Sequence, residues 1–295
     1  MSDPSPIDRL SNLLERFRVR AQLAYSGTFC GVQHFDAACG HGYLHVLRRG
    51  RLEVEHPAGT GLAAELTIEE PSLLFYPAPT THTFINPPKE GADFTCAAVR
   101  FDDGQNHPLV RALPPLVVLP LAQVDGLAPL LTLLFDETDR IRCGQRLMAD
   151  RLFELVLLQI LRWLLDHADS IGVNTGLLAG LSEPRIARAL VAMHEAPERV
   201  WALEQMAQAA GMSRTAFANT FKRVVGQTPA DYLTDWRMAL AKAKLREGRP
   251  IKGLADELGY ANPSALSRAF LARTGQSPRE WLKSVGAAEA PPGHQ

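Results

Sequence analysis

Two stretches of the chain gather hydrogen-bonding and basic side chains on one face of a short predicted helix. "SRTAFANTFKRV" begins at Ser213, and "NPSALSRAFLAR" begins at Asn262. In the first stretch, Phe217 and Phe221 stand four residues apart, which is the spacing of a buried helix face. The opposite face carries Arg214, Thr215, Ala218, Asn219 and Lys222. Guanidinium, ammonium, hydroxyl and amide groups in such an array can bind phosphates and base edges.

The second stretch repeats this arrangement. Leu266 and Phe270 mark its buried face, and the other face carries Ser264, Ala265, Ser267 and Arg268. The repeat extends beyond the helices, because "GQTP" at 226–229 returns as "GQSP" at 275–278. A register held over so many residues indicates a repeated structural unit.

Each copy predicts a helix, a tight turn and a second helix. The first helices, "LEQMAQAA" and "IKGLADEL", are followed by Gly211 and Gly259, which suit the left-handed end of a helix. Ser213 and Asn262 then supply N-caps for the second helices. This is the helix-turn-helix pattern, whose second helix enters the major groove of DNA. A long helix over 231–248 would hold the two reading helices roughly one DNA turn, about 34 Å, apart.

Residues 183–284 resemble the DNA-binding domain of the AraC/XylS family of bacterial transcription regulators. The resemblance is carried by "LEQMAQAAGMSRTAFANTFKRVVGQTPADYL", "WRMALAKAKL" and "LADELGYANPSALSRAFLARTGQSPREW". It implies recognition helices at about 213–224 and 263–273. It implies base contacts by Thr215, Ala218, Asn219, Ser264 and Arg268, of which Ala218 could touch only a thymine methyl. It implies phosphate contacts by Ser213, Arg214, Lys222, Arg237, Asn262 and Ser267.

The charge distribution agrees with a polyanion partner for the C-terminal part alone. Residues 183–284 contain 16 Lys and Arg against 10 Asp and Glu, whereas the rest contains 15 against 22. The formal net charge of −1 therefore hides a basic segment beside an acidic one.

The N-terminal part has a different texture. From about residue 22 to 101, short apolar runs such as "LEVEH" and "PSLLFYPAP" alternate with Gly and Pro, which predicts closely spaced strands in a small barrel or sandwich. Helices are then predicted over 129–140 and 145–168. The apolar stripe of the second helix is wide enough to pack on the strands and on a second copy of the chain.

"PSLLFYPAPTTHTFIN" at 71–86 resembles the second cupin motif through Pro77, Pro79, His82 and Asn86. The first cupin motif requires a His pair and a Glu. Here "GHGYLHVLRRG" supplies His45, with His41 as a second candidate, and no Glu at the expected place. The alternative of a cupin-type metalloenzyme fused to a DNA-binding module is therefore disfavoured. An architectural DNA-binding protein without an effector stays open as a third alternative, which indifference of DNA binding to metals, oxidants and metabolites would favour.

The whole chain resembles a subgroup of AraC-type regulators with an N-terminal cupin domain, whose known members include sensors of reactive chlorine species. The resemblance implies a soft-metal or redox site at Cys30, His45 and His82, with Cys30 as the redox group. A thiolate with two imidazoles suits Zn or Cu(I). An organic effector in the barrel stays open as another input, with a pocket lined by Phe75, Tyr76, Phe84 and Phe94. Cys39, Cys96 and Cys143 are expected to be core residues or bystanders.

The predicted fold class is α+β, with a cupin-like β-barrel, helices, and an all-α domain with two helix-turn-helix motifs. The expected divisions are a sensor domain at 1–125, a helical dimerisation and relay segment at 126–168, a linker at 169–183, the DNA-binding domain at 184–284 and a disordered tail at 285–295. No signal pattern, membrane-length apolar run or CxxC spacing is found, so a cytoplasmic protein is expected.

Together these observations predict a sequence-specific DNA-binding transcription regulator that is not an enzyme. We expect a dimeric activator that binds double-stranded promoter DNA and recruits RNA polymerase. Its cupin-like domain would sense an effector, a metal or an oxidant.

Overall fold

The computed structural model describes residues 7–86 and 91–288, which divide into two compact units. Residues Arg18–Asn174 form the first, here called the sheet unit. The second, the helical unit, joins the residues up to Phe17 to those from Thr175 onward. Each unit has its own core and is described by itself.

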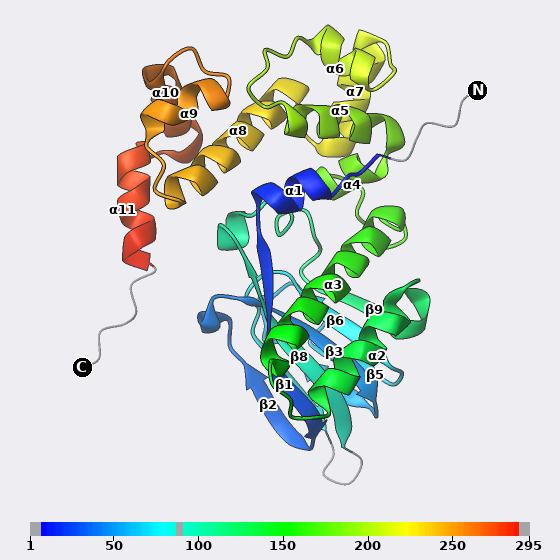
Figure 1. The fold of residues 1–295 in the computed structure, drawn as a ribbon. Coiled ribbons are helices and arrows are strands. Elements are labelled where there is room, and N and C mark those ends of the chain that lie inside the picture. Colours follow the sequence, from blue (N-terminus) through cyan, green and yellow to red (C-terminus); the bar gives the residue numbers. More distant parts are fainter. Residues whose placement is uncertain (1–6, 87–90, 289–295) are drawn as a thin grey trace. The chain divides into compact units, whose positions relative to one another are not determined.

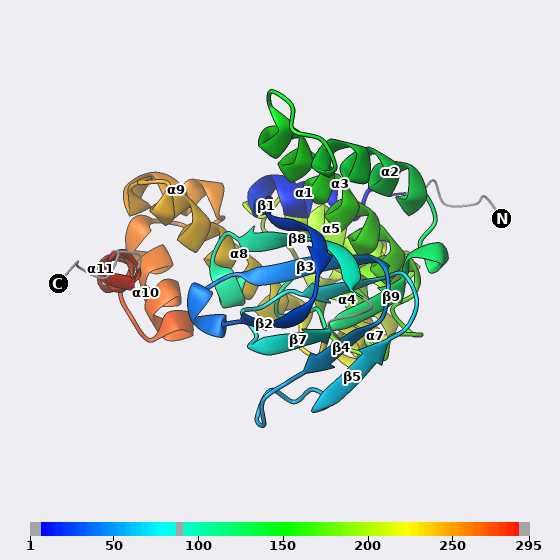
Figure 2. The ribbon, with the colours of Figure 1, turned by 90° about the horizontal axis from the view of Figure 1, so that it is seen from below.

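The sheet unit contains two antiparallel sheets, which Figure 2 shows as stacked layers. Sheet A has the strand order β1 (Val19–Phe29), β8 (Ala92–Phe101), β3 (Gly42–Arg49), β6 (Ser72–Tyr76), β9 (Val117–Pro120). Sheet B has the order β2 (Gly31–Phe35), β7 (His82–Asn86), β4 (Leu52–Glu55), β5 (Glu65–Ile68). The expected strands are therefore present, and they form a cupin-like pair of sheets.

The burial of the strands follows from their place between layers. In β7 the side chains alternate between buried and half-buried, because only one face of sheet B meets the core. All five side chains of β6 are buried, because sheet A is covered on both faces. The core between the sheets is apolar and aromatic, and it includes Phe35, Tyr43, Leu74, Tyr76, Phe84, Phe94 and Cys96.

Helices α2 (Leu127–Thr138) and α3 (Gln145–Asp166) cover the face of sheet A that points away from sheet B (Figure 2). Helix α3 lies against β1, where Oδ1 of Asp150 accepts a hydrogen bond of 2.7 Å from the backbone nitrogen of Leu23. Leu23 lies at one end of a β-bulge in β1, which falls between Leu23 and Tyr25. The helices predicted at 129–140 and 145–168 are confirmed to within two residues at each end. Short 3₁₀ helices lie at Ala37–Cys39, Gly104–Asn106 and Leu121–Gln123.

The helical unit contains α1 and α4 to α11. Their bounds are α1 (Ser11–Arg16), α4 (Leu177–Ser182), α5 (Pro184–Glu195), α6 (Leu203–Ala209), α7 (Arg214–Val225), α8 (Pro229–Arg246), α9 (Ile251–Glu257), α10 (Pro263–Thr274), α11 (Pro278–Ala288). Figure 1 shows the long α8 running from the α6–α7 pair to the α9–α10 pair. The predicted order of short helix, turn, recognition helix and long connection is confirmed.

Three segments differ from the divisions expected from the sequence. The segment at 169–183 contains α4, and Leu177 to Leu181 are buried against α5 and α7, so its second half is core and not a linker. Residues up to Phe17 group with the C-terminal helices, because the Phe17 ring packs edge-on against Trp236 at 5.1 Å. Helix α11 extends to Ala288, and the rest of the expected tail, 289–295, lies outside the described residues.

Within residues 7–86 and 91–288, no helix combines the length and the apolar character that a membrane span requires.

Candidate nucleic-acid interface and sensor core

The first helix-turn-helix is built as its sequence predicts. Gly211 ends the α6 segment with a φ of 65°, a left-handed conformation that favours glycine. The side chain of Ser213 then caps α7 by accepting a hydrogen bond of 3.4 Å from the backbone nitrogen of Ala216. Phe217 and Phe221 are fully buried beneath the helix. The opposite face of α7 is therefore turned to solvent.

The second copy uses the same devices with different residues. Gly259 has a φ of 70°, a left-handed conformation that favours glycine. A β-carbon there would also collide with the carbonyl oxygen of Glu198, so both the backbone conformation and the lack of space require glycine. Asn262 caps α10 by accepting from the backbone nitrogen of Ala265 at 2.8 Å. Leu266 and Phe270 are fully buried. The core faces predicted for both recognition helices are thus confirmed.

The predicted contact residues are mostly exposed on these two helices. The exposed residues of the first copy are Ser213, Arg214, Thr215, Asn219 and Lys222, and those of the second are Asn262, Ser264 and Arg268. Ala218 and Ser267 are half-buried. In the part of the chain that the structure describes, Lys222 and Arg268 form no ion pair, whereas Arg214 pairs with Glu204 at 2.9 Å. Lys222 and Arg268 are therefore the cations best placed to meet a phosphate or a base.

Arg237 lies elsewhere in the fold. Its Nε donates to the carbonyl oxygen of Pro197 at 2.7 Å, and its Nη2 donates to that of Arg199 at 2.9 Å. Its guanidinium also approaches the ring of Tyr260, with 5.6 Å from Cζ to the ring centroid. Arg237 thus joins the loop before α6 to the turn of the second motif, and only part of its donor capacity remains for a phosphate.

A second link fixes α10 to α8. Arg273, in the last turn of α10, contacts Asp231 at 2.5 Å and Asp235 at 3.5 Å, one turn apart on α8. Hydrogen bonds from Thr228 and Arg273 lower the pKa of Asp231, so this carboxylate stays charged at neutral pH. Helix α10 is therefore held on α8 by these ion pairs as well as by packing.

In the sheet unit, the structure brings His45 and His82 together between the sheets. Their Nε2 atoms are 3.0 Å apart, and both rings are buried. His82 Nδ1 lies 2.8 Å from the carbonyl oxygen of Thr80, which can only accept, so the His82 proton sits on Nδ1. His45 must then donate through Nε2, which leaves its buried Nδ1 without a partner among the described residues.

Aromatic rings enclose this pair. The His82 ring is stacked between Tyr76 at 4.0 Å and Phe35 at 4.7 Å, measured between ring centroids. Burial lowers the pKa of His82 to about 4 and that of His45 well below its usual value, so both imidazoles are neutral. The Tyr76 hydroxyl lies 2.8 Å from Nε2 of His56. Sequence reasoning missed His56 because it stands outside both cupin motifs, and only the folded sheet brings it to Tyr76.

Cys30 does not complete this site. It is exposed at the end of β1, and among the described residues no three His, Cys, Asp or Glu side chains are grouped so as to hold a metal ion. The set of Cys30, His45 and His82 expected for Zn or Cu(I) is therefore not assembled, because the thiol and the imidazoles belong to different regions of the unit. The residues present do not fit the metal that the resemblance implies.

The four aromatic residues expected to line an effector pocket are all buried. Tyr76, Phe84 and Phe94 belong to the packed core between the sheets, with 5.8 Å between the ring centroids of Phe84 and Phe94. Phe75 is fully buried as well. Cys96 is buried in the same core, and burial raises the pKa of its thiol to about 12, while Cys39 and Cys143 are exposed.

Comparison with known protein families identifies two regions. Residues 8–166 match the family described as Cupin, which is more than half of the chain, and residues 206–284 match the family described as Helix-turn-helix domain. The second region contains both turns and both recognition helices described above.

Similar proteins carry regulator names. A putative AraC-like transcription regulator of Streptomyces antibioticus is 36% identical over 179 residues, which are 59% of this chain and 58% of that protein. The chain therefore covers less than two thirds of that relative's length. The RCS-specific HTH-type transcriptional activator RclR of Escherichia coli (strain K12) is 24% identical over 246 residues, 82% of this chain and 84% of that protein.

Among solved structures, the DNA-binding domain of AdpA in complex with a target DNA is 26% identical. That likeness covers 37% of this chain and 97% of the other, with a TM-score of 0.33. Unsaturated fatty acid bound wild-type ToxT from Vibrio cholerae is 13% identical, covering 90% of this chain and 94% of the other, with a TM-score of 0.39.

Proposed function

The chain belongs to the cupin family and joins its cupin domain to an AraC-type helix-turn-helix domain, and from this premise we propose that it regulates transcription by binding specific promoter DNA. Its relatives in the comparison are transcription regulators, which supports a non-enzymatic role. The alternative of a cupin-type metalloenzyme would need a metal site, and no group of three metal-ligating side chains is found among the described residues.

One observation carries the proposal. Two recognition helices, α7 and α10, each turn an uncovered polar face to solvent while their apolar faces are fully buried. Both pack on α8, whose 18 residues span roughly 27 Å at about 1.5 Å per residue. Two helices held by one such connection can read successive major-groove segments of one duplex.

In this proposal Thr215, Ala218, Asn219, Ser264 and Arg268 contact bases. Phosphates are contacted by Ser213, Arg214, Lys222, Arg237, Asn262 and Ser267. Ser213 and Asn262 already use their side-chain oxygens as caps, so they act through their remaining hydrogen-bonding groups. Arg237 contributes chiefly by positioning, because two of its N–H groups are already donated to backbone carbonyls.

The test is selection of a binding sequence from a random duplex pool with the purified full chain. The selected duplex should bind at least about a thousandfold more tightly than unrelated DNA. A variant with Asn219→Ala and Arg268→Ala should lose this preference. Arg51→Ala, which removes an exposed arginine just before β4, should keep it. Failure to enrich any sequence would contradict the proposal.

The regulator would act as a homodimer that recruits RNA polymerase and activates transcription. The dimer is supported by apolar side chains exposed on α3, namely Leu147, Met148 and Leu155. An activating role is supported by the RclR relative, which is named a transcriptional activator. Transcription in a reconstituted system with and without the chain distinguishes activation from repression.

Cys30 is the proposed redox input. It is exposed, as an oxidant-reactive thiol must be, and the RclR relative is named as specific for RCS. Mild oxidant should change the affinity for the selected duplex in the wild type and not in Cys30→Ser. Cys143→Ser, which removes another exposed thiol, is the matched control and should respond like the wild type. Equal responses of all three proteins would exclude Cys30 as the sensor.

A further inference from the structure

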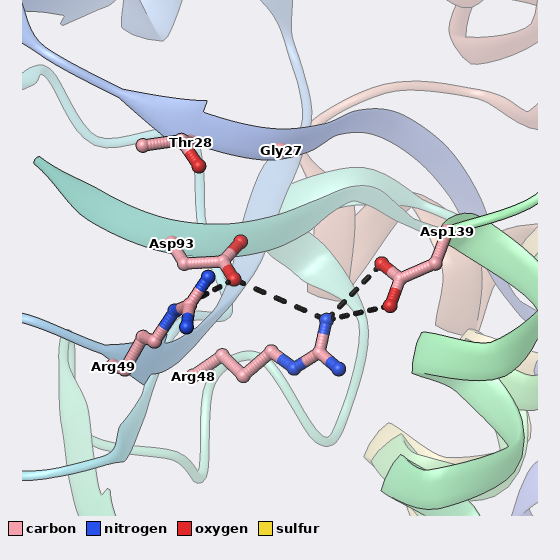
Figure 3. Close-up of a pocket in the computed structure, with 6 residues that line it drawn as sticks. All are labelled: Gly27, Thr28, Arg48, Arg49, Asp93 and Asp139. Atoms are coloured by element: carbon pink, nitrogen blue, oxygen red, sulfur yellow. Dashed lines mark hydrogen bonds and ion pairs between the residues drawn. The ribbon is translucent and has the colours of Figure 1, made fainter.

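The sheet unit has a polar pocket of about 320 Å³ on its outer surface, separate from the His45–His82 pair. Figure 3 shows its lining, which comes from the ends of β1, β3, β8 and α2. The lining residues are Gly27, Thr28, Arg48, Arg49, Asp93 and Asp139. Two consecutive arginines face the same carboxylate in this view, which a regular strand would not allow, because neighbouring side chains of a strand point to opposite faces.

A β-bulge in β3 explains how both arginines reach one side. Leu47 pairs with Phe94 of β8 and Arg49 pairs with Asp93, so Arg48 is an extra residue without a partner in the ladder. A bulge of this kind re-aims a side chain and is common beside functional sites. The bulge therefore builds a pair of guanidinium groups where the sheet alone would place one.

The carboxylates hold each guanidinium by only one of its nitrogens. Arg48 Nη1 lies 2.9 Å and 3.1 Å from the two carboxylate oxygens of Asp139, and 3.9 Å from Asp93. Arg49 Nε lies 3.3 Å from Asp93. The guanidinium of Arg48 also lies over the ring of Phe135, with 4.5 Å from Cζ to the ring centroid. Both cations are thus oriented in advance of any ligand.

The remaining donors are unused. Among the described residues, Nε and Nη2 of Arg48 and both Nη atoms of Arg49 have no hydrogen-bond or ion-pair partner. Nε and Nη2 form the edge of a guanidinium that binds a carboxylate or phosphate through two parallel hydrogen bonds. Gly27 and Thr28 of β1 also line the pocket, and Thr28 contributes a hydroxyl group.

We propose that this pocket binds a small molecule through a carboxylate or phosphate group, held by Arg48 and Arg49. Asp93, whose side chain is 14% exposed, positions both guanidinium groups. Asp139 is 48% exposed, and ion pairs of such exposure contribute little to stability. The ligand's oxyanion takes the free Nε–Nη2 edge of Arg48, and its negative charge repels the carboxylate that Asp139 holds at Nη1 of the same guanidinium.

The position of Asp139 gives the binding a structural consequence. Asp139 is the C-cap residue of α2, so its ion pair with Arg48 ties the end of α2 to the bulge of β3. A bound oxyanion loosens this tie at the end of α2, which packs on α3, the helix that the proposed function assigns to dimerisation. This regulatory step rests on the proposed function, whereas the binding itself does not.

Calorimetric titration of the full chain with citrate and with inorganic phosphate, against chloride at equal ionic strength, tests the binding. We expect saturable binding of at least one of these anions, and the anion that binds identifies the group. The double variant Arg48→Gln, Arg49→Gln should weaken binding by about tenfold or more, because both bidentate donors are lost. Arg51→Gln, which removes a neighbouring exposed arginine paired with Glu53, should bind like the wild type.

Asp139→Asn is an independent test of the pocket. It removes the negative charge beside Arg48 and should therefore tighten binding of the anion. This variant keeps the shape of the side chain, so the proposal stays testable if the double arginine variant fails to fold. Absence of saturable binding below about 10 mM for both anions, far weaker than typical metabolite sites, overturns the proposal. Unchanged affinity in Asp139→Asn together with unchanged affinity in the arginine variant also overturns it.

Separate measurements distinguish this proposal from the proposed function. Anion binding is measured without DNA, and duplex binding is measured without the anion. A chain that binds its selected duplex and neither anion refutes the pocket alone. A chain that binds an anion and enriches no duplex refutes the regulator alone.

Discussion

Nε of Arg237 lies 2.7 Å from the carbonyl oxygen of Pro197, and this bond connects the two halves of the helical unit. Arg237 belongs to α8, Pro197 to the loop that precedes the first helix-turn-helix, and the nearby Tyr260 to the turn of the second. Burial lowers the pKa of the half-buried guanidinium, which nevertheless remains charged. A residue that family resemblance assigns to phosphate contact is thus also a clamp within the unit.

Replacing Arg237 by alanine should lower the free energy of unfolding of the helical unit by about 1–3 kcal/mol, since the carbonyl oxygens of Pro197 and Arg199 lose a charged donor. Trp163 is the one tryptophan of the sheet unit, so a Trp163→Phe background makes tryptophan fluorescence report on the helical unit. Urea titration in this background measures the change. Arg237→Lys should recover part of the loss. Unchanged stability with a flatter salt dependence of DNA binding would instead make Arg237 a phosphate contact only.

Lys222→Ala should weaken binding to selected and unrelated duplexes alike. Lys222 is exposed on α7 and has no ion-pair partner in the described part of the chain, so its charge is available to a phosphate. The slope of the logarithm of the binding constant against the logarithm of salt concentration should fall in magnitude by roughly one. Arg51→Ala on the sheet unit is the charge-matched control. A loss confined to the selected sequence would mean that Lys222 contacts a base.

Arg268→Ala should cost about 1–3 kcal/mol on the selected duplex and relax the preference at one base pair. Arg268 is exposed on α10 and unpaired among the described residues, so its guanidinium can present two donors to a guanine. Binding to four duplexes that differ only at that base pair measures the preference. If all four lose the same affinity, Arg268 contacts the backbone and not a base.

The helix-turn-helix pair could be predicted from sequence because its boundaries are set by local residues. Gly211 and Gly259 adopt the positive φ that their positions require, and Ser213 and Asn262 cap the helices that follow. Each of these effects acts within three or four residues of the chain. No distant contact was needed to locate α7 or α10.

The sensor residues depend on long-range pairing, and there the sequence was insufficient. His45 lies in sheet A opposite Cys96, and His82 lies in sheet B opposite Phe35, so only the packing of the two sheets brings the imidazoles together. Resemblance identified both histidines, yet it grouped them with Cys30, which the fold leaves apart. The pair of arginines at 48 and 49 was missed because strand alternation predicts opposite faces, and a bulge cannot be read from these residue types.

Charging the exposed face of α3 should dissociate the proposed dimer. Met148 and Leu155 stand seven residues apart on one side of the helix and are 54% and 47% exposed. A variant with Met148→Glu and Leu155→Glu should elute as a monomer in light-scattering chromatography, because two carboxylates would be buried in the interface. Val200→Glu, at a position that is 85% exposed in the helical unit, is the control. A monomeric wild type would contradict the proposal that this face of α3 forms a dimer interface.

His194 should make the helical unit sensitive to acid. Its ring is buried, stacks on Trp236 with centroids 3.8 Å apart, and has Nε2 2.5 Å from the Tyr232 hydroxyl. Burial lowers its pKa to about 3, whereas the unfolded chain binds a proton at this imidazole below about pH 6.5. Unfolding therefore takes up a proton in this window, so stability falls as the pH decreases through it.

When the pH falls from 7.5 to 5.5, His194 alone should lower the free energy of unfolding by about 1.4 kcal/mol. This is the free energy of taking up one proton over one pH unit, because the unfolded imidazole is protonated only in the lower half of this range. Urea titrations of the Trp163→Phe background at both pH values give this difference, and adding His194→Gln should reduce it by that amount. The comparison uses the change with pH within each protein, so a general loss of stability in the glutamine variant does not affect it. An equal pH dependence with and without His194 would mean that the folded unit protonates this imidazole as readily as the unfolded chain does.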